Sequence, residues 1–201
     1  IFISNGLADL KEMMIADDIL RKNGAKQIYW MKANTSYPTP LHEVNLKTIN
    51  HMSKMLNSIV GFSDHTLNFD ITLAAVASGA KIIEKHIKLE SKSKTVDDFF
   101  SLNPKDFAAM VKAIRNVEQA IGSVDYNIPK SSRKYLNGKR SLYVCQNIHK
   151  GDAINENNIR SIRPSFGLST EYYDLILGAK VKRDLFVGDR VKLKDLYIQP
   201  K

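Results

Sequence analysis

The chain has 201 residues, of which 43% are hydrophobic and 25% charged, and this composition predicts one or two globular domains rather than disorder. No apolar run approaches the length of a membrane span, so we expect no membrane partner. The lone Cys145 excludes an internal disulfide and suits a reducing compartment, from which we expect a cytoplasmic protein.

The net charge of +9 is spread unevenly along the chain. Residues 1–121 carry 15 basic and 13 acidic side chains, a net of +2, whereas residues 122–201 carry 15 and 8, a net of +7. Such a basic segment can bind nucleic acid, an anionic substrate or an acidic surface of a partner chain. Because the basic residues are scattered singly and lack interleaved aromatic residues, we expect no nucleic-acid partner.

Strand-like and helix-like patterns alternate in the first part of the chain. Short apolar runs predict strands at residues 1–4, 27–31, 59–62 and 81–85. Helical stripes follow these strands in turn, at residues 10–20, 46–56, 69–78 and 103–121. In the last of them, Asn103 suits the N-cap and Pro104 the first helical position. This order with short links predicts an α/β fold built on a parallel sheet.

The pattern changes after residue 122. Residues 123–138 are polar and include Pro129, which predicts a linker between two domains. In residues 139–201, short strand-like runs alternate with turns, and we expect strands at 141–145, 179–181 and 190–193. We therefore predict a first domain over residues 1–122 and a small β-rich domain over residues 139–201.

Two histidines each stand just past a predicted strand. His65 ends the run Gly-Phe-Ser-Asp-His at residues 61–65, and His86 follows the strand at 81–85. Because parallel strands end at one edge of a sheet, both imidazoles can meet at one metal ion there. The alternative is two unrelated histidines with separate partners. By the period of two along a strand, Glu84 points to the side of His86 and Lys85 points away.

Several short motifs together resemble the sialic acid synthase family. In the first domain they are ISNG (3–6), YPTP (37–40) with Asn45-Leu46, GFSDHT (61–66), IEKH (83–86) and FSL (100–102). In the second they are RSLY (140–143), KGD (150–152), RSIRP (160–164) and GLS (167–169). The resemblance implies the C-terminal half of a (β/α)8 TIM barrel followed by an antifreeze-like SAF domain. It also implies that the first half of the barrel is missing from this chain.

The resemblance implies a metal-dependent transferase. This family condenses phosphoenolpyruvate with an N-acetylmannosamine-type amino sugar, releases phosphate and yields a nine-carbon sugar acid. His65 and His86 match its ligands for Mn²⁺ or Mg²⁺, and Glu84 matches a residue that orients water or moves a proton. Asp64, beside His65, is a candidate to support that ligand. On its own, the chain is expected to be an inactive part of the enzyme.

Further residues match positions that bind the two substrates. The matching residues are Ser4, Thr35, Tyr37, Ser63, Asp97 and Arg163. In the family, the arginine reaches the active site of the other subunit, which implies a domain-swapped homodimer. Residues 32–35 (Lys-Ala-Asn-Thr) and 95–98 (Thr-Val-Asp-Asp) depart from the usual motifs, and this leaves the identity of the sugar open.

Two other functions remain open from the sequence. The first is a non-catalytic carbohydrate-binding or SAF-type interaction module that has lost its barrel. The second is another metal-dependent barrel, such as an aldolase, which predicts a Schiff-base lysine or a third metal ligand. Lys85 is the obvious lysine near the predicted strand ends, and it points away from His86 by the period of two.

Overall fold

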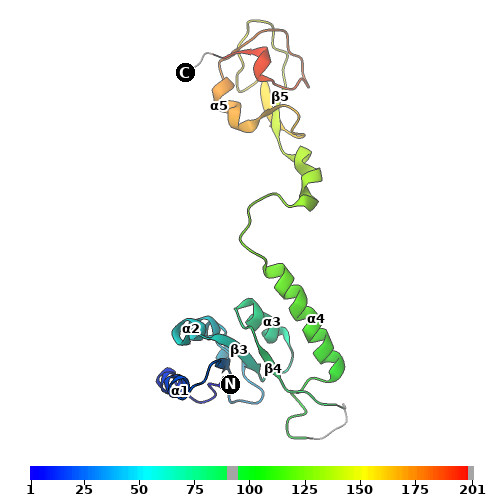
Figure 1. Ribbon diagram of the computed structural model, residues 1–201. Coiled ribbons are helices and arrows are strands. Elements are labelled where there is room, and N and C mark those ends of the chain that lie inside the picture. Colours follow the sequence, from blue (N-terminus) through cyan, green and yellow to red (C-terminus); the bar gives the residue numbers. More distant parts are fainter. Residues whose placement is uncertain (90–94, 199–201) are drawn as a thin grey trace. The chain divides into compact units, whose positions relative to one another are not determined.

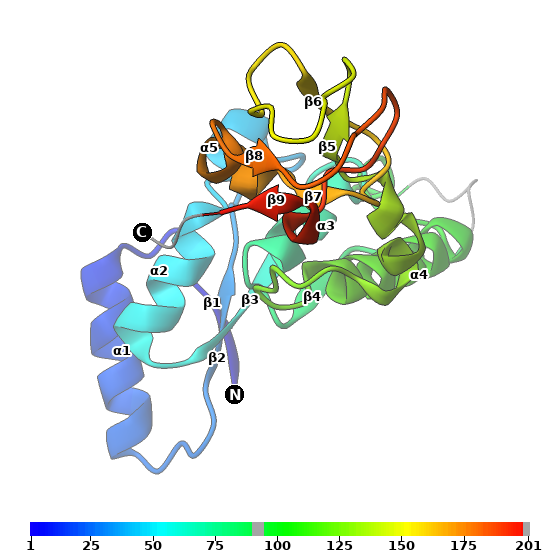
Figure 2. The ribbon, with the colours of Figure 1, turned by 90° about the horizontal axis from the view of Figure 1, so that it is seen from above.

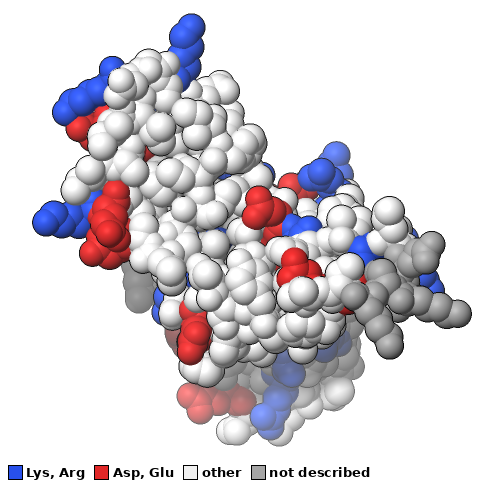
Figure 3. Space-filling model, turned by 90° about the horizontal axis from the view of Figure 1, so that it is seen from below, with Lys and Arg blue, Asp and Glu red and all other residues white. Residues whose placement is uncertain are grey.

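A computed structural model describes residues 1–89 and 95–198 of the chain. They form two compact units, Ile1–Val124 and Asp125–Lys201, which Figure 1 shows in sequence colours. In the described part of the chain, no helix combines the length and apolar character needed to cross a membrane. Acidic and basic side chains are interspersed over the face of the molecule seen in Figure 3.

The first unit is an α/β structure, as the sequence predicted. Its strands are β1 (Phe2–Ser4), β2 (Tyr29–Lys32), β3 (Ile59–Asp64) and β4 (Ile83–Lys85), and its helices are α1 (Leu10–Lys22), α2 (Lys47–Leu56), α3 (Asp70–Ala77) and α4 (Pro104–Ile121), with a 3₁₀ turn η1 (Leu41–Glu43). The strands form one four-stranded parallel sheet in the order β1-β2-β3-β4. The strands predicted at residues 27–31 and 81–85 begin two residues later than expected.

Side-chain caps start two of these helices. At α1, Asp9 accepts a hydrogen bond from the backbone N–H of Glu12, and the Glu12 carboxylate accepts one from the Asp9 N–H, which forms a capping box. At α4, the side chain of Asn103 accepts from the Asp106 N–H, and Pro104 takes the first turn, as predicted.

One face of the sheet is packed against the helices. Alternate strand residues, among them Trp30, Val60 and Phe62, are at most 2% exposed and belong to one core with residues of α1 and α2. Figure 2 shows α1 and α2 lying along the strands. On the opposite face, Phe2 is 64% and Ile59 49% exposed. Period two therefore separates the helix-covered face from a second face, here called the open face, which is exposed at the start of β1 and β3 but buried at Met31 and Ser63, both 3% exposed.

The second unit has short strands, as predicted. It contains β5 (Ser141–Val144), β6 (Ile159–Ile162), β7 (Leu168–Ser169), β8 (Lys180–Val181), β9 (Leu196–Tyr197), the helix α5 (Tyr173–Ile176) and the 3₁₀ turns η3 (Thr170–Tyr172) and η4 (Leu193–Asp195). A three-stranded sheet has the order β6-β5-β7, and β8 pairs with β9. Apolar side chains from the strands, α5 and η3 form a core of this unit.

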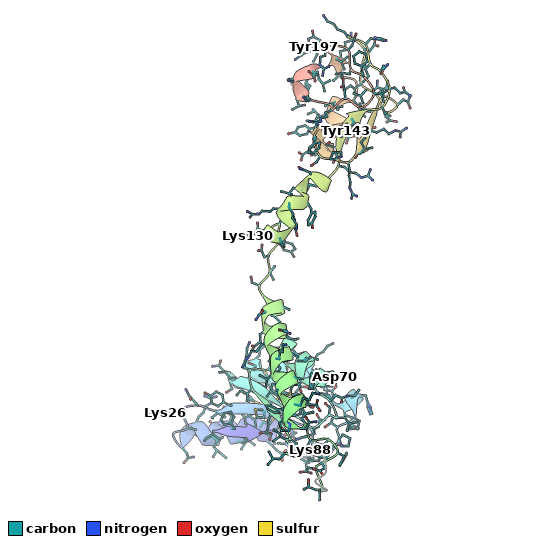
Figure 4. The ribbon with its side chains drawn as sticks, turned by 90° about the vertical axis from the view of Figure 1, so that its right-hand side faces the viewer. Lys26, Asp70, Lys88, Lys130, Tyr143 and Tyr197 are labelled. Atoms are coloured by element: carbon teal, nitrogen blue, oxygen red, sulfur yellow. The ribbon has the colours of Figure 1, made fainter. Side chains whose placement is uncertain are left out.

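One expectation for this region is wrong in detail, and another gains detail. Within the predicted linker, Lys130–Gly138 forms the exposed 3₁₀ helix η2, which begins at the Lys130 labelled in Figure 4. Residues 190–193 do not form a strand. Arg190 makes an isolated bridge with Tyr143, and η4 begins at Leu193. Val191 still donates to the Leu142 carbonyl at 3.0 Å and accepts from the Leu168 N–H at 2.8 Å, so this segment hydrogen-bonds to β5 and β7 without forming a regular strand.

Candidate active site

The two predicted metal ligands lie together at the carboxyl end of the sheet. His65 directly follows β3 and His86 directly follows β4, and the two strands pair in parallel. Their ring centroids are 5.4 Å apart. Two imidazoles whose nitrogens each lie about 2.1 Å from one ion can have this separation. The structure therefore brings together the histidines that the sequence singled out.

Backbone contacts fix the orientation of His65. Its Nδ1 lies 2.8 Å from the carbonyl oxygen of Asn34 and donates to it, because a carbonyl can only accept. This leaves Nε2 as the acceptor nitrogen, 3.3 Å from the hydroxyl of Ser63. Burial lowers the pKa of the imidazole, against the opposing effect of the Asn34 hydrogen bond. A neutral ring with one nitrogen tied to a carbonyl is the form that binds metals.

Glu84 joins this group through Ser63. The Ser63 hydroxyl donates to the Glu84 Oε1 at 2.6 Å, and the two residues are Cα partners in the β3–β4 register. This contact puts Glu84 on the open face of the sheet with Ser63 and His65, as period two predicted. A carboxylate here can accept a proton or orient a water beside the imidazoles.

Aromatic rings pack around both histidines. The Tyr37 ring is 4.4 Å from the His65 ring and 5.5 Å from that of Phe100, measured between centroids. Phe100 is 1% exposed and its ring lies 4.7 Å from the His86 ring. Tyr37 is 47% exposed, so it forms an accessible wall while Phe100 forms a buried floor.

A pocket of about 480 Å³ opens beside His86. The described residues that line it are His86, Ile87, Lys88, Leu89, Thr95, Asp97, Asp98 and Ser101, which combine polar and apolar side chains. Asp97 Oδ2 is 3.5 Å from His86 Nδ1, so the predicted sugar ligand lies next to the predicted metal ligand. Lys88, labelled in Figure 4, donates to the carbonyl oxygen of Asp98 at 2.6 Å. Hydroxyl, carboxylate and ammonium groups suit a polyhydroxy ligand.

His65 and His86 are the two side chains of this site with imidazole nitrogens that could bind a metal ion. Among residues 1–89 and 95–198, no cluster of three or more His, Cys, Asp or Glu side chains could hold a metal ion. A catalytic zinc site usually has three protein ligands, so the two imidazoles supply one ligand fewer than such a site. The choice of Mn²⁺ or Mg²⁺ stays a prediction.

The remaining predicted site residues are spread over both units. Ser4 ends β1 opposite Met31, and Met31 pairs with Gly61, so Ser4 shares the open face with Ser63. Thr35 lies at the end of β2 near Gly6, where an added Cβ would be 3.4 Å from the Thr35 hydroxyl. Arg163 follows β6 in the second unit, and its role stays a prediction.

The Asp64 carboxylate makes its hydrogen bonds away from the His65 ring. It accepts from Thr66 and Thr72 and lies 3.2 Å from the Lys85 ammonium. The side chain therefore points to the helix-covered face, since it follows Ser63 by one residue in the strand. Lys85 also points there, as predicted.

Comparison with known proteins identifies the class. Residues 1–126 match the NeuB family, and residues 139–196 match the SAF domain. The chain belongs to the NeuB family, to which the sialic acid synthases resembled by its motifs also belong.

Named relatives support this assignment. The chain is 36% identical over 193 residues to a pseudaminic acid synthase of Campylobacter jejuni, covering 96% of this chain and 56% of the relative. It is 38% identical over 181 residues to the N,N'-diacetyllegionaminic acid synthase of that species, covering 89% and 54%. The solved N-acetylneuraminic acid synthetase of Leptospira borgpetersenii, in complex with citrate, has a TM-score of 0.61 and 28% identity, covering 67% and 47%. The chain thus spans about half the length of the curated relatives it matches.

Several contributing residues were missed from the sequence. Asn34 contributes a backbone carbonyl, which no side-chain pattern reveals. Phe100 was read only as part of a motif, and its contact with both imidazoles comes from tertiary packing. The pairing of Asp64 with Lys85 depends on the register of β3 and β4. The sequence signal for this pair is that each residue directly precedes one of the two histidines.

Proposed function

We propose that this chain forms the C-terminal half of the barrel, together with the SAF domain, of a nonulosonic acid synthase. The reaction joins the enol carbon of phosphoenolpyruvate to the aldehyde carbon of an N-acetylmannosamine-type sugar. Water adds at the neighbouring carbon, and carbon–oxygen cleavage then releases phosphate. The products are a nine-carbon sugar acid and inorganic phosphate, and we place the reaction in the cytoplasm.

The observation that carries this proposal is the joint placement of His65, His86 and Glu84 on one strand edge. The ring centroids lie 5.4 Å apart, and Ser63 links the carboxylate to the His65 side. The names of the relatives support the substrate class. A divalent cation bound by the two histidines would polarise the sugar aldehyde as a Lewis acid.

The chain's own residues bind and orient the substrates. Asp97, at the wall of the pocket beside His86, accepts hydrogen bonds from sugar hydroxyls. Ser4, Thr35 and Ser63 provide hydroxyls toward the phosphate. Because the Ser63 proton is given to Glu84 in the structure, Ser63 donates to a phosphate only after that hydrogen bond switches. Glu84 then exchanges a proton with the water that adds.

A chimaera tests the proposal. The N-terminal portion of the C. jejuni pseudaminic acid synthase that precedes the matched region is joined to Ile1 of this chain. We expect phosphate release that requires phosphoenolpyruvate, an amino sugar and a divalent cation. His86→Ala should abolish it while the circular dichroism spectrum is kept, because loss of a Lewis acid raises the barrier by several kcal/mol.

Two outcomes would contradict the proposal. The first is a folded chimaera without activity on any 6-carbon amino sugar offered. The second is a His86→Ala variant that stays fully active under chelation. The first outcome would favour the non-catalytic carbohydrate-binding module. Binding of the same sugars without turnover, measured by calorimetry, would identify it.

A further inference from the structure

A buried ion pair lies directly behind the two histidines. Asp64 and Lys85 are the residues that precede His65 and His86, and they are Cα partners in the β3–β4 register. The side chains of both have no exposed area, and Lys85 Nζ is 3.2 Å from Asp64 Oδ2. The pair thus joins the two strands at the last paired position before the imidazoles.

The pair also holds the turn that follows His65. Asp64 Oδ1 accepts from the backbone N–H of Thr66 at 2.8 Å and from its hydroxyl at 2.7 Å. Lys85 Nζ donates to the backbone carbonyl of Thr66 at 2.5 Å. Both neighbours of His65 in the chain are therefore fastened to the residue that precedes His86.

A third anchor comes from helix α3. The hydroxyl of Thr72, which is fully buried, donates to Asp64 Oδ2. With Thr66 and Lys85, it gives the carboxylate a full set of donors. The network therefore joins β3, β4 and α3 at one point on the helix-covered face.

Fold stability is a weak reason for such a pair. Removing two charges from water costs about as much as their attraction returns, and apolar pairs of similar size often serve as well. Unlike an apolar contact, the pair fixes the geometry of its partners, because each hydrogen bond restricts a distance and an angle. The atoms that it fixes belong to the backbone on both sides of His65 and just before His86.

We propose that Asp64 and Lys85 are positioning residues that set the separation and orientation of His65 and His86. They act from the opposite face of the sheet and touch neither substrate nor metal. The metal part of this inference rests on the proposed function, whereas the geometry of the two imidazoles does not.

The test uses the full 201-residue chain with two readouts. One is the nuclear Overhauser contact between the ring protons of His65 and His86, measured without metal. The other is Mn²⁺ affinity by calorimetry. The variants are Lys85→Met and the charge-free double variant Asp64→Asn with Lys85→Met. The matched control is Arg21→Met, which breaks the 2.6 Å ion pair with Asp17 on α1.

We expect both Lys85 variants to lose the ring contact and to bind Mn²⁺ 10- to 100-fold more weakly, the usual loss when a partner behind a metal ligand is removed. Arg21→Met should change neither readout, although it lowers stability. Unchanged ring contacts and Mn²⁺ affinity in folded Lys85 variants would overturn the proposal. Failure of both Lys85 variants to fold would also overturn it, because the pair would then serve the fold.

A separate outcome isolates the proposed function. If the unaltered chain binds no Mn²⁺ yet the ring contact is lost only in the Lys85 variants, the positioning role stands and the metal role is wrong.

Discussion

The hydroxyl of Ser63 holds Glu84 in place. It donates to Glu84 Oε1 at 2.6 Å, and Glu84 is an exposed residue. Since the same hydroxyl lies 3.3 Å from His65 Nε2, a change at either neighbour alters where the serine proton points.

We predict that Glu84→Gln in the chimaera lowers kcat by roughly 10²- to 10⁴-fold, the usual contribution of a positioned acid or base. The amide keeps the size of the side chain and can still accept from Ser63, but it cannot take up a proton. Steady-state phosphate release measures the effect. A kcat within twofold of the unaltered chimaera would remove Glu84 from the proton-transfer step.

Lys32 carries an amine that is costly to charge. It is 4% exposed, its Nζ donates to the side chain of Asn34, and burial lowers the pKa of this amine to about 8. An unfolded lysine has a pKa near 10.4, so the unfolded chain binds more protons than the folded one between these values. Stability from this group therefore rises as the pH increases from about 8 to about 10.

We predict that Lys32→Met is more stable than the unaltered chain at pH 7, by up to about 3 kcal/mol, and that this advantage shrinks toward pH 10. Urea unfolding of both proteins at several pH values measures the difference. Lys26→Met, at an exposed position, is the control and should show no such trend. A stability advantage of Lys32→Met that does not change with pH would mean that folding does not lower the pKa of the Lys32 amine.

At the scale of elements, strand β3 has no room for a side chain at Gly61. A Cβ placed there would lie 2.4 Å from Met31 Sδ and 2.7 Å from the backbone oxygen of Ile82. The methionine can move, but the oxygen belongs to the segment that leads into β4, and Phe62 donates to it at 2.8 Å. The spacing of the strands that carry the histidines thus depends on this glycine.

We predict that Gly61→Ala destabilises the chain by about 1–3 kcal/mol, the usual cost of overpacking. Gly138→Ala is the matched control, because no described residue beyond its neighbours in the chain comes within 4 Å of its Cβ position. Denaturant unfolding compares the two. Equal stability of both variants would show that β3 and β4 can separate without cost.

Elements with a strong internal pattern were predictable from the sequence. The stripe and cap of α4 are local, and its observed bounds, Pro104–Ile121, follow from Asn103, Pro104 and Gly122. Residues 190–193 were not predictable, because their bridge forms with β5, which is distant in the sequence. The same holds at the site. Period two placed Glu84 and Lys85 on opposite faces, but the partner of Lys85 depends on strand register.

For the whole molecule, part of the open face of the sheet is exposed. Parallel sheets occur almost only with both faces covered, yet Phe2 and Ile59 at the strand starts are 64% and 49% exposed, whereas Met31 on the same face is 3% exposed. The strands β1 and β4 are also edges of the four-stranded sheet. Under the proposed function, the other half of a barrel covers this face and pairs with both edges. The chain's length, about half that of its relatives, agrees with this proposal.

Arg163 belongs to the second unit, whereas the histidines belong to the first. An arginine that binds an anionic substrate contributes charge-assisted hydrogen bonds, so Arg163→Ala in the chimaera should lower activity roughly 10- to 100-fold. If this arginine serves the partner subunit, mixing Arg163→Ala with His86→Ala subunits creates one intact site in each mixed dimer. Random pairing then restores about a quarter of full activity. Two affinity tags purify the mixed dimers, and inactive mixed dimers would show that Arg163 does not act on the partner's site.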